Sequence, residues 1–421
     1  MTLAEYDTSA YIPKDELSLW WLGDPSRPVR VGELNHVRTL RAVSLRYDPN
    51  WLRAGFALSE DLPLTDQTFI PTEKDTAAGS VNDARPDRWG ERVIRYLDKP
   101  ARLSLMEYLL FAGDERFGAL GVSAQSDAYQ PTSHGPLPFI ADLPTLDWLV
   151  QQVMAGEPVA PEHRRLMSPG ATLGGARPKA LMQLDGDAWV VKFAETGDWV
   201  DTPLMEHATM TLAAKAGIRV AETRLLKLDD SHRDRTRHAV AVKRFDRQGN
   251  QRLHALSADV ALRAACESLS YSALAQILRR KGVGKDQLHL MQMHELYRRM
   301  VFNILIDNTD DHEKNHVLLM NDRQEYELAP AFDVLPALQS LGYQQLQVGS
   351  AMADSSLDNA LSHAHLFGLK LNQAKSIHQE VIAVVNHWSE HFRETGMSER
   401  DVEFIAQHLD RPFLMNQRWR N

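Results

Sequence analysis

The pattern of apolar and polar positions divides the chain into three stretches of different character. Residues 17–22 and 29–34 are short runs rich in Leu, Val and Trp on either side of a turn that contains Gly and Pro, which predicts a pair of strands. From Asp87 to Phe111 the apolar positions recur at helical spacing. The segment 130–138 has three prolines and the composition of a linker or long loop, so we expect a domain boundary close to it.

The second stretch, between residues 168 and 247, mixes strand-like and helical segments. A glycine-rich turn at 170–175 precedes an expected hairpin whose strands are joined by Asp185-Gly186-Asp187. A helix ended by Gly217 and two more strands should follow. The expected strands are 179–184, 188–193, 220–228 and 239–245, and the expected helix is 205–216.

The third stretch begins near residue 256 and is mainly helical in its spacing. Its expected helices are 258–269, 271–280, 286–307, 372–388 and 399–409. This order predicts an α+β protein with a bilobal, protein-kinase-like fold. The predicted parts are a β-rich N-terminal region at 1–135, a small α+β lobe at 136–250 and a mainly helical C-terminal lobe at 251–421.

Composition narrows the classes of function. The 421 residues are 43% hydrophobic and 24% charged, as in ordinary globular proteins, and the formal net charge is −9. A protein that binds nucleic acid without sequence preference usually has a basic surface, so no direct nucleic-acid binding is expected. The single cysteine, Cys266, fits a reducing compartment. A polar, acidic start and the lack of a long apolar run predict a cytoplasmic protein without membrane contact.

The densest group of polar residues, at 307–316, carries the candidate chemistry. Asp310 and Asn315 are five positions apart, the interval that protein kinases use in their catalytic loop. In those enzymes the aspartate accepts the proton of the attacking hydroxyl and the asparagine oxygen binds Mg²⁺. Asp333 follows in an apolar, proline-framed setting, where a bound cation would offset the cost of burying a carboxylate. Asn315 and Asp333 are therefore the expected metal ligands.

Phosphoryl transfer also needs cations and backbone amides at the phosphates. The segment 168–179 contains glycines whose backbone can approach phosphates closely, although it is not a Walker A loop because Ala176 follows Gly175. Lys192 lies in the second strand of the hairpin, and Glu206 in the next helix could hold it by an ion pair. The run from Val242 to Arg247 lies where an interlobe hinge and the adenine would be.

Several motifs together resemble the HipA family of bacterial serine/threonine toxin kinases, which belong to type II toxin–antitoxin systems. The most specific is Asn308-Thr-Asp-Asp-His-x-Lys-Asn315. The other motifs are Gly174-Gly-Ala-Arg-Pro-Lys179, Lys243-Arg-Phe-Asp-Arg247, Leu328-Ala-Pro-Ala-Phe-Asp-Val334, Arg85-Pro-Asp-Arg-Trp-Gly90 and Gly113-Asp-Glu-Arg-Phe-Gly-Ala-Leu120. The resemblance covers nearly the whole chain.

The resemblance implies an ATP- and Mg²⁺-dependent kinase with a role for each matching residue. Asp310 would be the catalytic base and His312 part of the catalytic loop, and Asn315 and Asp333 would bind Mg²⁺. Lys192 would contact the ATP phosphates. The other implied nucleotide-binding residues are Gly174, Gly175, Lys179, Glu206, Lys243, Phe245 against the base and Asp246 near the ribose.

The family is also known to phosphorylate its own glycine-rich loop. The matching hydroxyl here is Thr172, where the family commonly has serine, and Ser168 is a second candidate. The resemblance further implies a protein substrate, such as a translation factor or an aminoacyl-tRNA synthetase, and a small DNA-binding antitoxin as partner.

Three alternatives remain open at the level of sequence. His312-Glu-Lys-Asn-His316 matches the zinc-protease pattern, in which both histidines lie on one helix. A small-molecule kinase of the aminoglycoside or choline type has a similar spacing of aspartate and asparagine. A pseudokinase that binds nucleotide without transferring phosphate is the third alternative.

Overall fold

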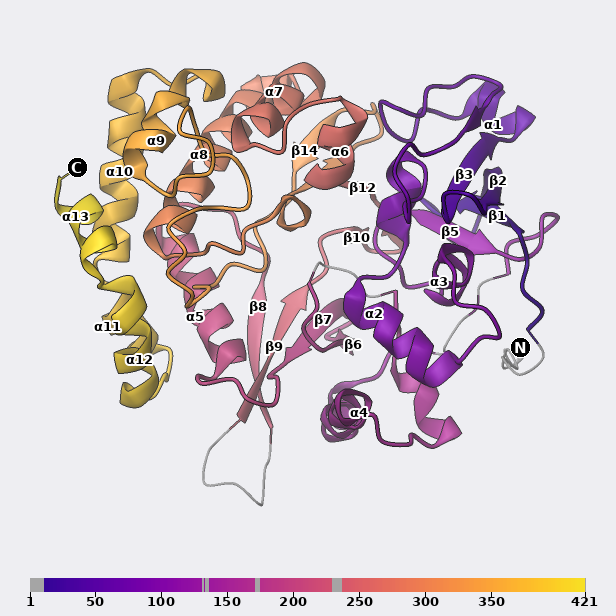
Figure 1. The fold of residues 1–421 in the computed structure, drawn as a ribbon, viewed down its shortest axis with the longest axis horizontal. Coiled ribbons are helices and arrows are strands. Elements are labelled where there is room, and N and C mark those ends of the chain that lie inside the picture. Colours follow the sequence, from indigo (N-terminus) through magenta and orange to yellow (C-terminus); the bar gives the residue numbers. More distant parts are fainter. Residues whose placement is uncertain (1–10, 131, 133–135, 171–174, 229–236, 421) are drawn as a thin grey trace. The chain divides into compact units, whose positions relative to one another are not determined.

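The computed structural model describes residues 11–130, 132, 136–170, 175–228 and 237–420. These residues form two compact units. The first runs to Phe193 and also includes Lys243–Leu256, and the second comprises Ala194–Val242 and Ser257 onward. Figure 1 shows both units coloured along the chain.

The first unit contains most of the strands. They are β1 Glu16–Trp21, β2 Val29–Val37, β3 Ala42–Tyr47, β4 Thr68–Phe69, β5 Leu120–Ser123, β6 Lys179–Leu184, β7 Asp187–Phe193, β10 Arg247–Gln248, β11 Gln251–Arg252 and most of β12 His254–Ser257. Its helices are α1 Pro49–Ala54, α2 Arg88–Val93, α3 Leu105–Phe111 and α4 Leu143–Ala155.

The second unit is mainly helical. Its helices are α5 Thr202–Lys215, α6 Ala258–Ala264, α7 Tyr271–Lys281, α8 Leu288–Leu305, α9 Leu357–Ser362, α10 Leu371–Val385, α11 Trp388–Glu394, α12 Glu399–Leu409 and α13 Pro412–Arg420. Its strands are β8 Thr223–Leu228, β9 Arg237–Lys243, β13 Val317–Met320 and β14 Tyr326–Leu328. The expected α+β class, β-rich first and helical later, is confirmed.

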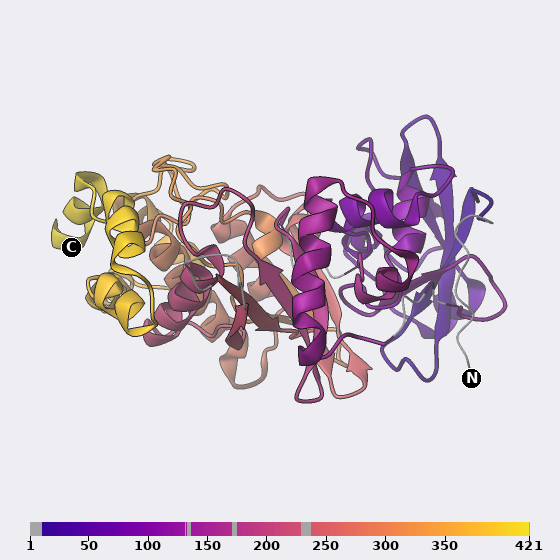
Figure 2. The same ribbon diagram turned by 90° about the horizontal axis from the view of Figure 1, so that it is seen from below.

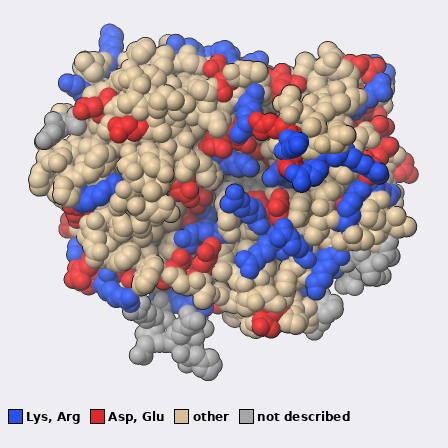
Figure 3. Space-filling model, viewed as in Figure 1, with Lys and Arg blue, Asp and Glu red and all other residues tan. Residues whose placement is uncertain are grey.

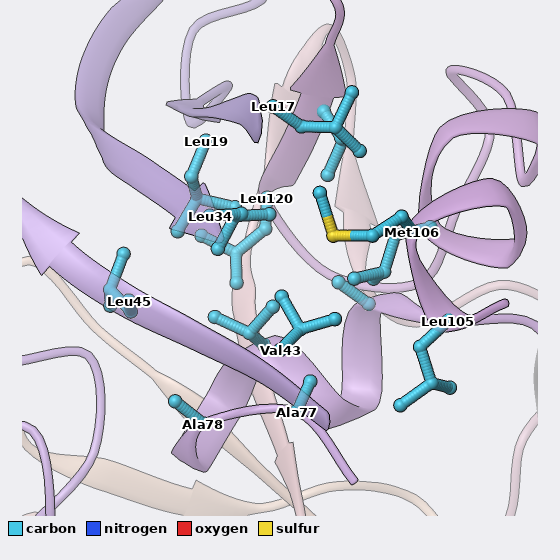
Figure 4. Packing of buried hydrophobic residues seen from close by; sticks show 14 of the residues in the cluster. Leu17, Leu19, Leu34, Val43, Leu45, Ala77, Ala78, Leu105, Met106 and Leu120 are labelled. Carbon is cyan, nitrogen blue, oxygen red and sulfur yellow. The ribbon is translucent and has the colours of Figure 1, made fainter. Parts of the chain in front are cut away.

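A five-stranded antiparallel sheet in the order β4-β3-β2-β1-β5 forms the centre of the N-terminal region. Leu19, Leu34 and Val43 on its inner face pack against Met106 of α3 (Figure 4). These side chains are completely buried. The predicted pairing of the first two runs is confirmed, because β1 pairs with β2 along its whole length.

Some helical predictions match the structure closely, since α12 spans the predicted 399–409 and α7 ends one residue beyond the predicted 271–280, whereas others differ in extent. The segment 87–111, whose apolar spacing is helical, contains two separate helical stretches, because the left-handed Lys99 and the following Pro100 end the first. Ser104 then starts α3 with a capping box completed by Glu107. The helix expected at 258–269 stops at Ala264. Sequence spacing alone did not reveal these breaks.

The C-terminal helices of the second unit pack on its earlier helices. In Figures 1 and 2, α11 and α12 (yellow) lie beside α5, and α11 contacts α5 directly. A hydrogen bond of 2.9 Å joins Nε2 of His391 on α11 to the hydroxyl of Thr211 on α5. The predicted helix 372–388 corresponds to α10, which ends at Val385, and Trp388 is already the first residue of α11.

Charged side chains of both signs occur on the face drawn in Figure 3. Within the described part of the chain, each helix is too short or too polar to cross a bilayer.

A buried histidine in the first unit gives stability a pH dependence. His254 is buried, its Nε2 lies 2.8 Å from the carbonyl of Leu58, and its ring lies edge-on to Trp21 and Phe56. Burial lowers the pKa of His254 from 6.5 to about 4, and the hydrogen bond to the Leu58 carbonyl opposes this shift. As the pH falls, His254 therefore takes up a proton at a higher pH in the unfolded chain than in the folded protein. The free energy of unfolding should fall by up to about 1.4 kcal/mol per pH unit as the pH drops below about 6.5.

Urea unfolding between pH 7.5 and 5 measures this slope. A His254→Gln variant should give a flatter pH dependence, whereas His387→Gln, at an exposed histidine, should leave it unchanged. Equal slopes for wild type and His254→Gln would contradict the prediction.

Candidate active site

The loop 306–316 leaves the end of α8 through a left-handed turn at Asp307. Asp307 is buried, and its carboxylate accepts two hydrogen bonds from the guanidinium of Arg411, at 2.6 and 2.9 Å. This two-point pairing fixes the point where the loop starts. The loop ends in a single turn of 3-10 helix, Glu313–Asn315, which leads into β13.

The two residues expected to be central to catalysis have opposite environments within this loop. Asp310 is exposed, so its carboxylate is accessible to a substrate. Asn315 is buried, and its side-chain NH₂ donates to the backbone carbonyl of Asp310 at 3.4 Å. His312 caps the short helical turn by accepting a hydrogen bond from the amide of Lys314 at 3.3 Å. The loop thus holds Asp310 and Asn315 together, as their spacing predicted.

A buried polar cluster lies directly behind the loop 306–316. Asp311 accepts a hydrogen bond from the hydroxyl of Tyr271, and its Oδ2 lies 2.8 Å from Nε2 of His316. Asn303 of α8 donates to the Tyr271 hydroxyl at 3.4 Å and accepts from Asn308 at 3.1 Å. All these side chains are buried. The hydrogen bonds of the buried Asp311 side chain therefore hold the loop so that the neighbouring Asp310 side chain is exposed.

The pKa shifts of Asp311 and Tyr271 fit their place in this buried cluster. Burial by itself would raise the pKa of Asp311, but His316 and the hydrogen bonds to it lower the pKa below its usual value. Burial and the Asp311 charge raise the pKa of Tyr271 far above its usual value, so the phenol stays a hydrogen-bond donor. Sequence analysis missed Tyr271 and Asn303, because nothing in their local pattern distinguishes them from helical core residues.

The segment that carries Asp333 is held in place by backbone pairing and by one buried arginine. Ala331 exchanges backbone hydrogen bonds of 2.8 Å with Arg219 and Ala221. Arg299 of α8 is buried and donates to the carbonyl of Ala329 at 2.8 Å. Asp333 itself has a left-handed backbone, with φ of 57°. A short aspartate tolerates this conformation better than a branched residue does.

The surroundings of Asn315 suit the metal ligand that the sequence predicts. A small cavity in the second unit is lined by Asn315 and by both neighbours of Asp333, Phe332 and Val334. Among the described residues, the buried side-chain oxygen of Asn315 has no hydrogen-bond partner. Burial removes water from this amide oxygen, which costs free energy unless a hydrogen-bond donor or a cation takes the place of the water. Oxygen ligands from an amide and a carboxylate suit Mg²⁺.

The zinc-protease alternative does not fit this geometry. The histidines of that pattern must lie on one α-helix, but here His312 precedes a 3-10 turn and His316 follows it. His316 is buried with its Nε2 against Asp311. The two rings therefore do not share a helical face.

Both lysines of the expected phosphate site lie on the β6–β7 hairpin of the first unit. Lys179 and Lys192 are directly opposite in the antiparallel register, and both are buried. Lys179 donates to Asp87 at 2.6 Å and to the carbonyl of Gly175 at 3.0 Å. Glu206 is buried on α5 in the second unit, and its pairing with Lys192 stays a prediction.

The remaining candidates of the glycine-rich segment lie at its edges. Ser168 is partly buried, and Gly175 has a positive φ of 91°, which favours glycine. Gly174 and Thr172 lie outside the described residues, so their expected roles stay predictions.

The predicted hinge, Lys243 to Asp246, shows two kinds of environment. Lys243 is half-exposed, and its ammonium lies 2.6 Å from Asp187. Phe245 packs edge-on against Phe117, with ring centroids 6.0 Å apart. Asp246, in contrast, is completely buried. The role of Phe245 against the adenine stays a prediction.

The carboxylate of Asp246 is surrounded by donors from its own unit. It accepts hydrogen bonds from Arg244 at 2.9 and 2.7 Å, from Arg247 at 2.8 Å and from the amide of Gly118 at 2.8 Å. Burial alone would raise the pKa of Asp246, but the two guanidinium groups lower it well below its usual value. This geometry supports a structural role, and the expected place near a ribose stays a prediction.

The sequence matches two domain models of a known family. The HipA-like C-terminal domain matches residues 171–388, and the HipA N-terminal domain matches residues 26–123. This chain belongs to the HipA family. The resemblance inferred from the motifs is thereby confirmed for the HipA N- and C-terminal domains alike.

A solved structure has the same HipA fold. It is a chain from the Shewanella oneidensis MR-1 toxin–antitoxin complex of HipA, HipB and operator DNA, with a TM-score of 0.64 and 19% identity. The alignment covers 96% of this chain and 97% of that one.

Two curated relatives are named as kinases. "Putative kinase Y4dM" of Sinorhizobium fredii (strain NBRC 101917 / NGR234) is 26% identical over 53% of this chain and 57% of its own length. "Putative kinase" of Haemophilus influenzae (strain ATCC 51907 / DSM 11121 / KW20 / Rd) is 26% identical over 30% of this chain and 39% of its own length. The chain thus spans less than two thirds of the length of each of these relatives.

Proposed function

We propose that this chain is an ATP- and Mg²⁺-dependent serine/threonine protein kinase of the HipA toxin type. The observation that carries the proposal is the pair formed by an exposed Asp310 and a buried Asn315 whose amide oxygen has no partner among the described residues. A general base must reach the substrate, whereas a metal ligand must be held in a fixed position. The two environments meet these two needs.

In this mechanism Asp310 accepts the proton of the attacking protein hydroxyl as the phosphoryl group is transferred. Asn315 and Asp333 would hold Mg²⁺, which supplies charge stabilisation to the phosphate oxygens. Lys192 would contact the phosphates, held by Glu206. Phosphoryl transfer depends mostly on position and charge, so the rigid polar contacts behind the loop are part of the proposal.

The wider assignments rest on family membership. The proposed division into a region at 1–135, a small lobe at 136–250 and a C-terminal lobe at 251–421 follows the order of motifs. The complex of the Shewanella relative contains HipB and operator DNA, so we propose a small DNA-binding antitoxin as partner here and DNA contact through that partner. A cytoplasmic location and a protein substrate in translation complete the proposal.

Incubation with Mg²⁺ and γ-labelled ATP, followed by phosphopeptide mapping, tests the activity. Phosphate on Thr172 or Ser168 in the wild type, and none without Mg²⁺, is the expected result. Binding of ATP without any transfer to protein would instead favour a pseudokinase. Transfer to an aminoglycoside or choline but not to protein would favour the small-molecule alternative. Failure to bind ATP would contradict the proposal altogether.

A further inference from the structure

Lys179 was expected to contact nucleotide, and its ammonium group contacts two acceptors inside the first unit. The side chain is buried, with only 1% of its surface exposed, and Asp87 supplies the opposite charge at 2.6 Å. The same ammonium donates to the carbonyl of Gly175 at 3.0 Å. Lys179 therefore connects the N-terminal region to the end of the glycine-rich segment.

Asp87 performs two tasks at once. Its Oδ2 holds Lys179, and its Oδ1 accepts a hydrogen bond of 2.8 Å from the amide of Gly90, which caps α2. The next residue but one, Trp89, donates from its indole to the carbonyl of Lys179 at 2.7 Å. The start of α2 thus contacts both the backbone and the side chain of the first residue of β6.

The ion pair between Asp87 and Lys179 also affects the charge next to Lys192. Directly opposite residues of an antiparallel pair project to the same face, so Lys179 and Lys192 are close neighbours. Two like charges in that arrangement repel each other. Asp87 neutralises Lys179 and so limits this repulsion at Lys192.

The beginning of the glycine-rich segment is held by close packing as well. A Cβ on Gly90 would lie 2.1 Å from the carbonyl oxygen of Pro169, and a Cβ on Gly170 would lie 2.2 Å from that of Ala112. Both approaches are too close for any side chain. Glycine at each position therefore lets the two backbones touch.

We propose that the motif Arg85–Gly90 is a positioning element for the described edges of the glycine-rich segment, acting through Asp87 on Lys179 and through Gly90 on Pro169. The inference rests on the proposed kinase function and deepens it. Asp87 and Gly90 are positioning residues that set how the hairpin and the edges of the segment meet the phosphates of ATP.

Asp87→Asn is the first test, because asparagine keeps the cap of α2 and removes the charge. The affinity for Mg²⁺-ATP should fall about tenfold, as for a weakened charged hydrogen bond, with a matching rise in KM and little change in kcat. The affinity for adenosine should not change, because adenosine has no phosphates. Asp75→Asn, which removes an exposed ion pair with Arg41, is the control.

Gly90→Ala tests the contact between Gly90 and the Pro169 carbonyl independently. This variant should lower the affinity for Mg²⁺-ATP in the same way. Amide hydrogen exchange of residues 175–184 without nucleotide should be faster in both variants and unchanged in Asp75→Asn. Unchanged exchange would overturn the positioning role whether or not the wild type binds ATP. If exchange is faster but the wild type binds no ATP, the proposed kinase function fails instead. Equal loss of ATP and adenosine binding together with a collapsed melting temperature would also overturn the inference.

Discussion

Replacing Asp310 by alanine is expected to slow phosphoryl transfer by about 10²–10⁴-fold while ATP binding stays intact. Asp310 is exposed, and the contacts that hold the loop are made by its neighbours Asp311 and Asn315. Removing its carboxylate should therefore remove the base without disturbing the fold. Single-turnover phosphorylation at saturating ATP measures the rate, and calorimetric titration measures the ATP affinity.

The matched control for Asp310→Ala is Asp322→Ala, an exposed aspartate of the same unit on the turn between β13 and β14. That variant should keep the wild-type rate. A rate for Asp310→Ala within tenfold of wild type would show that another group accepts the proton. Loss of ATP binding together with the rate would indicate that Asp310 has a structural role instead.

Replacing Asp246 by alanine is expected to destabilise the first unit by about 3–5 kcal/mol. The variant would leave Arg244 and Arg247 buried without the carboxylate that both now contact. A buried charge without its partner is one of the largest single-residue penalties in a folded protein. Urea unfolding at pH 7 measures the effect.

Asp187→Ala is the control for Asp246→Ala, because its ion pair with Lys243 is half-exposed and should contribute at most about 1 kcal/mol. The same experiment distinguishes the two roles considered for Asp246. A stable Asp246→Ala protein with weakened binding of ATP and adenosine would support the ribose contact that the motif implies. Strong destabilisation would support the structural role that the geometry favours.

The pH dependence of stability provides a second check on Asp246. Because its pKa in the folded protein lies below its usual value, the folded state binds this proton less readily than the unfolded chain does. Its contribution to stability is therefore present above the pKa of the unfolded chain and is lost as the pH falls through the acid range. Asp246→Asn should reduce this acid sensitivity.

Sequence patterns could predict a candidate catalytic loop because the residues of its proposed chemistry are close together in the chain. Asp310 and Asn315 lie within one loop, so their spacing alone constrains their separation in space. The β6–β7 hairpin was equally predictable, since its Asp-Gly-Asp turn joins adjacent strands. The family motifs added the N-terminal region, whose match to the HipA N-terminal domain is confirmed.

Contacts between residues far apart in the chain were not predictable from local patterns. Lys179 and Asp87 are separated by 92 positions, and Gly118 and Asp246 by 128. No periodicity or spacing links such residues, because their meeting depends on how whole elements pack. For this reason the sequence assigned Lys179 and Asp246 to the nucleotide, whereas the structure surrounds both with partners from their own unit.

The amino-acid sequence by itself determined the family, the α+β class and the identity of the groups that carry the proposed chemistry. These follow from residue types at short spacing and from motifs that extend over most of the chain. Only the tertiary structure decided which polar side chains are exposed and which are buried, as for Asp310 and Asp311. Burial is a property of packing in three dimensions, and it separates a residue that can meet a substrate from one that holds the loop in place.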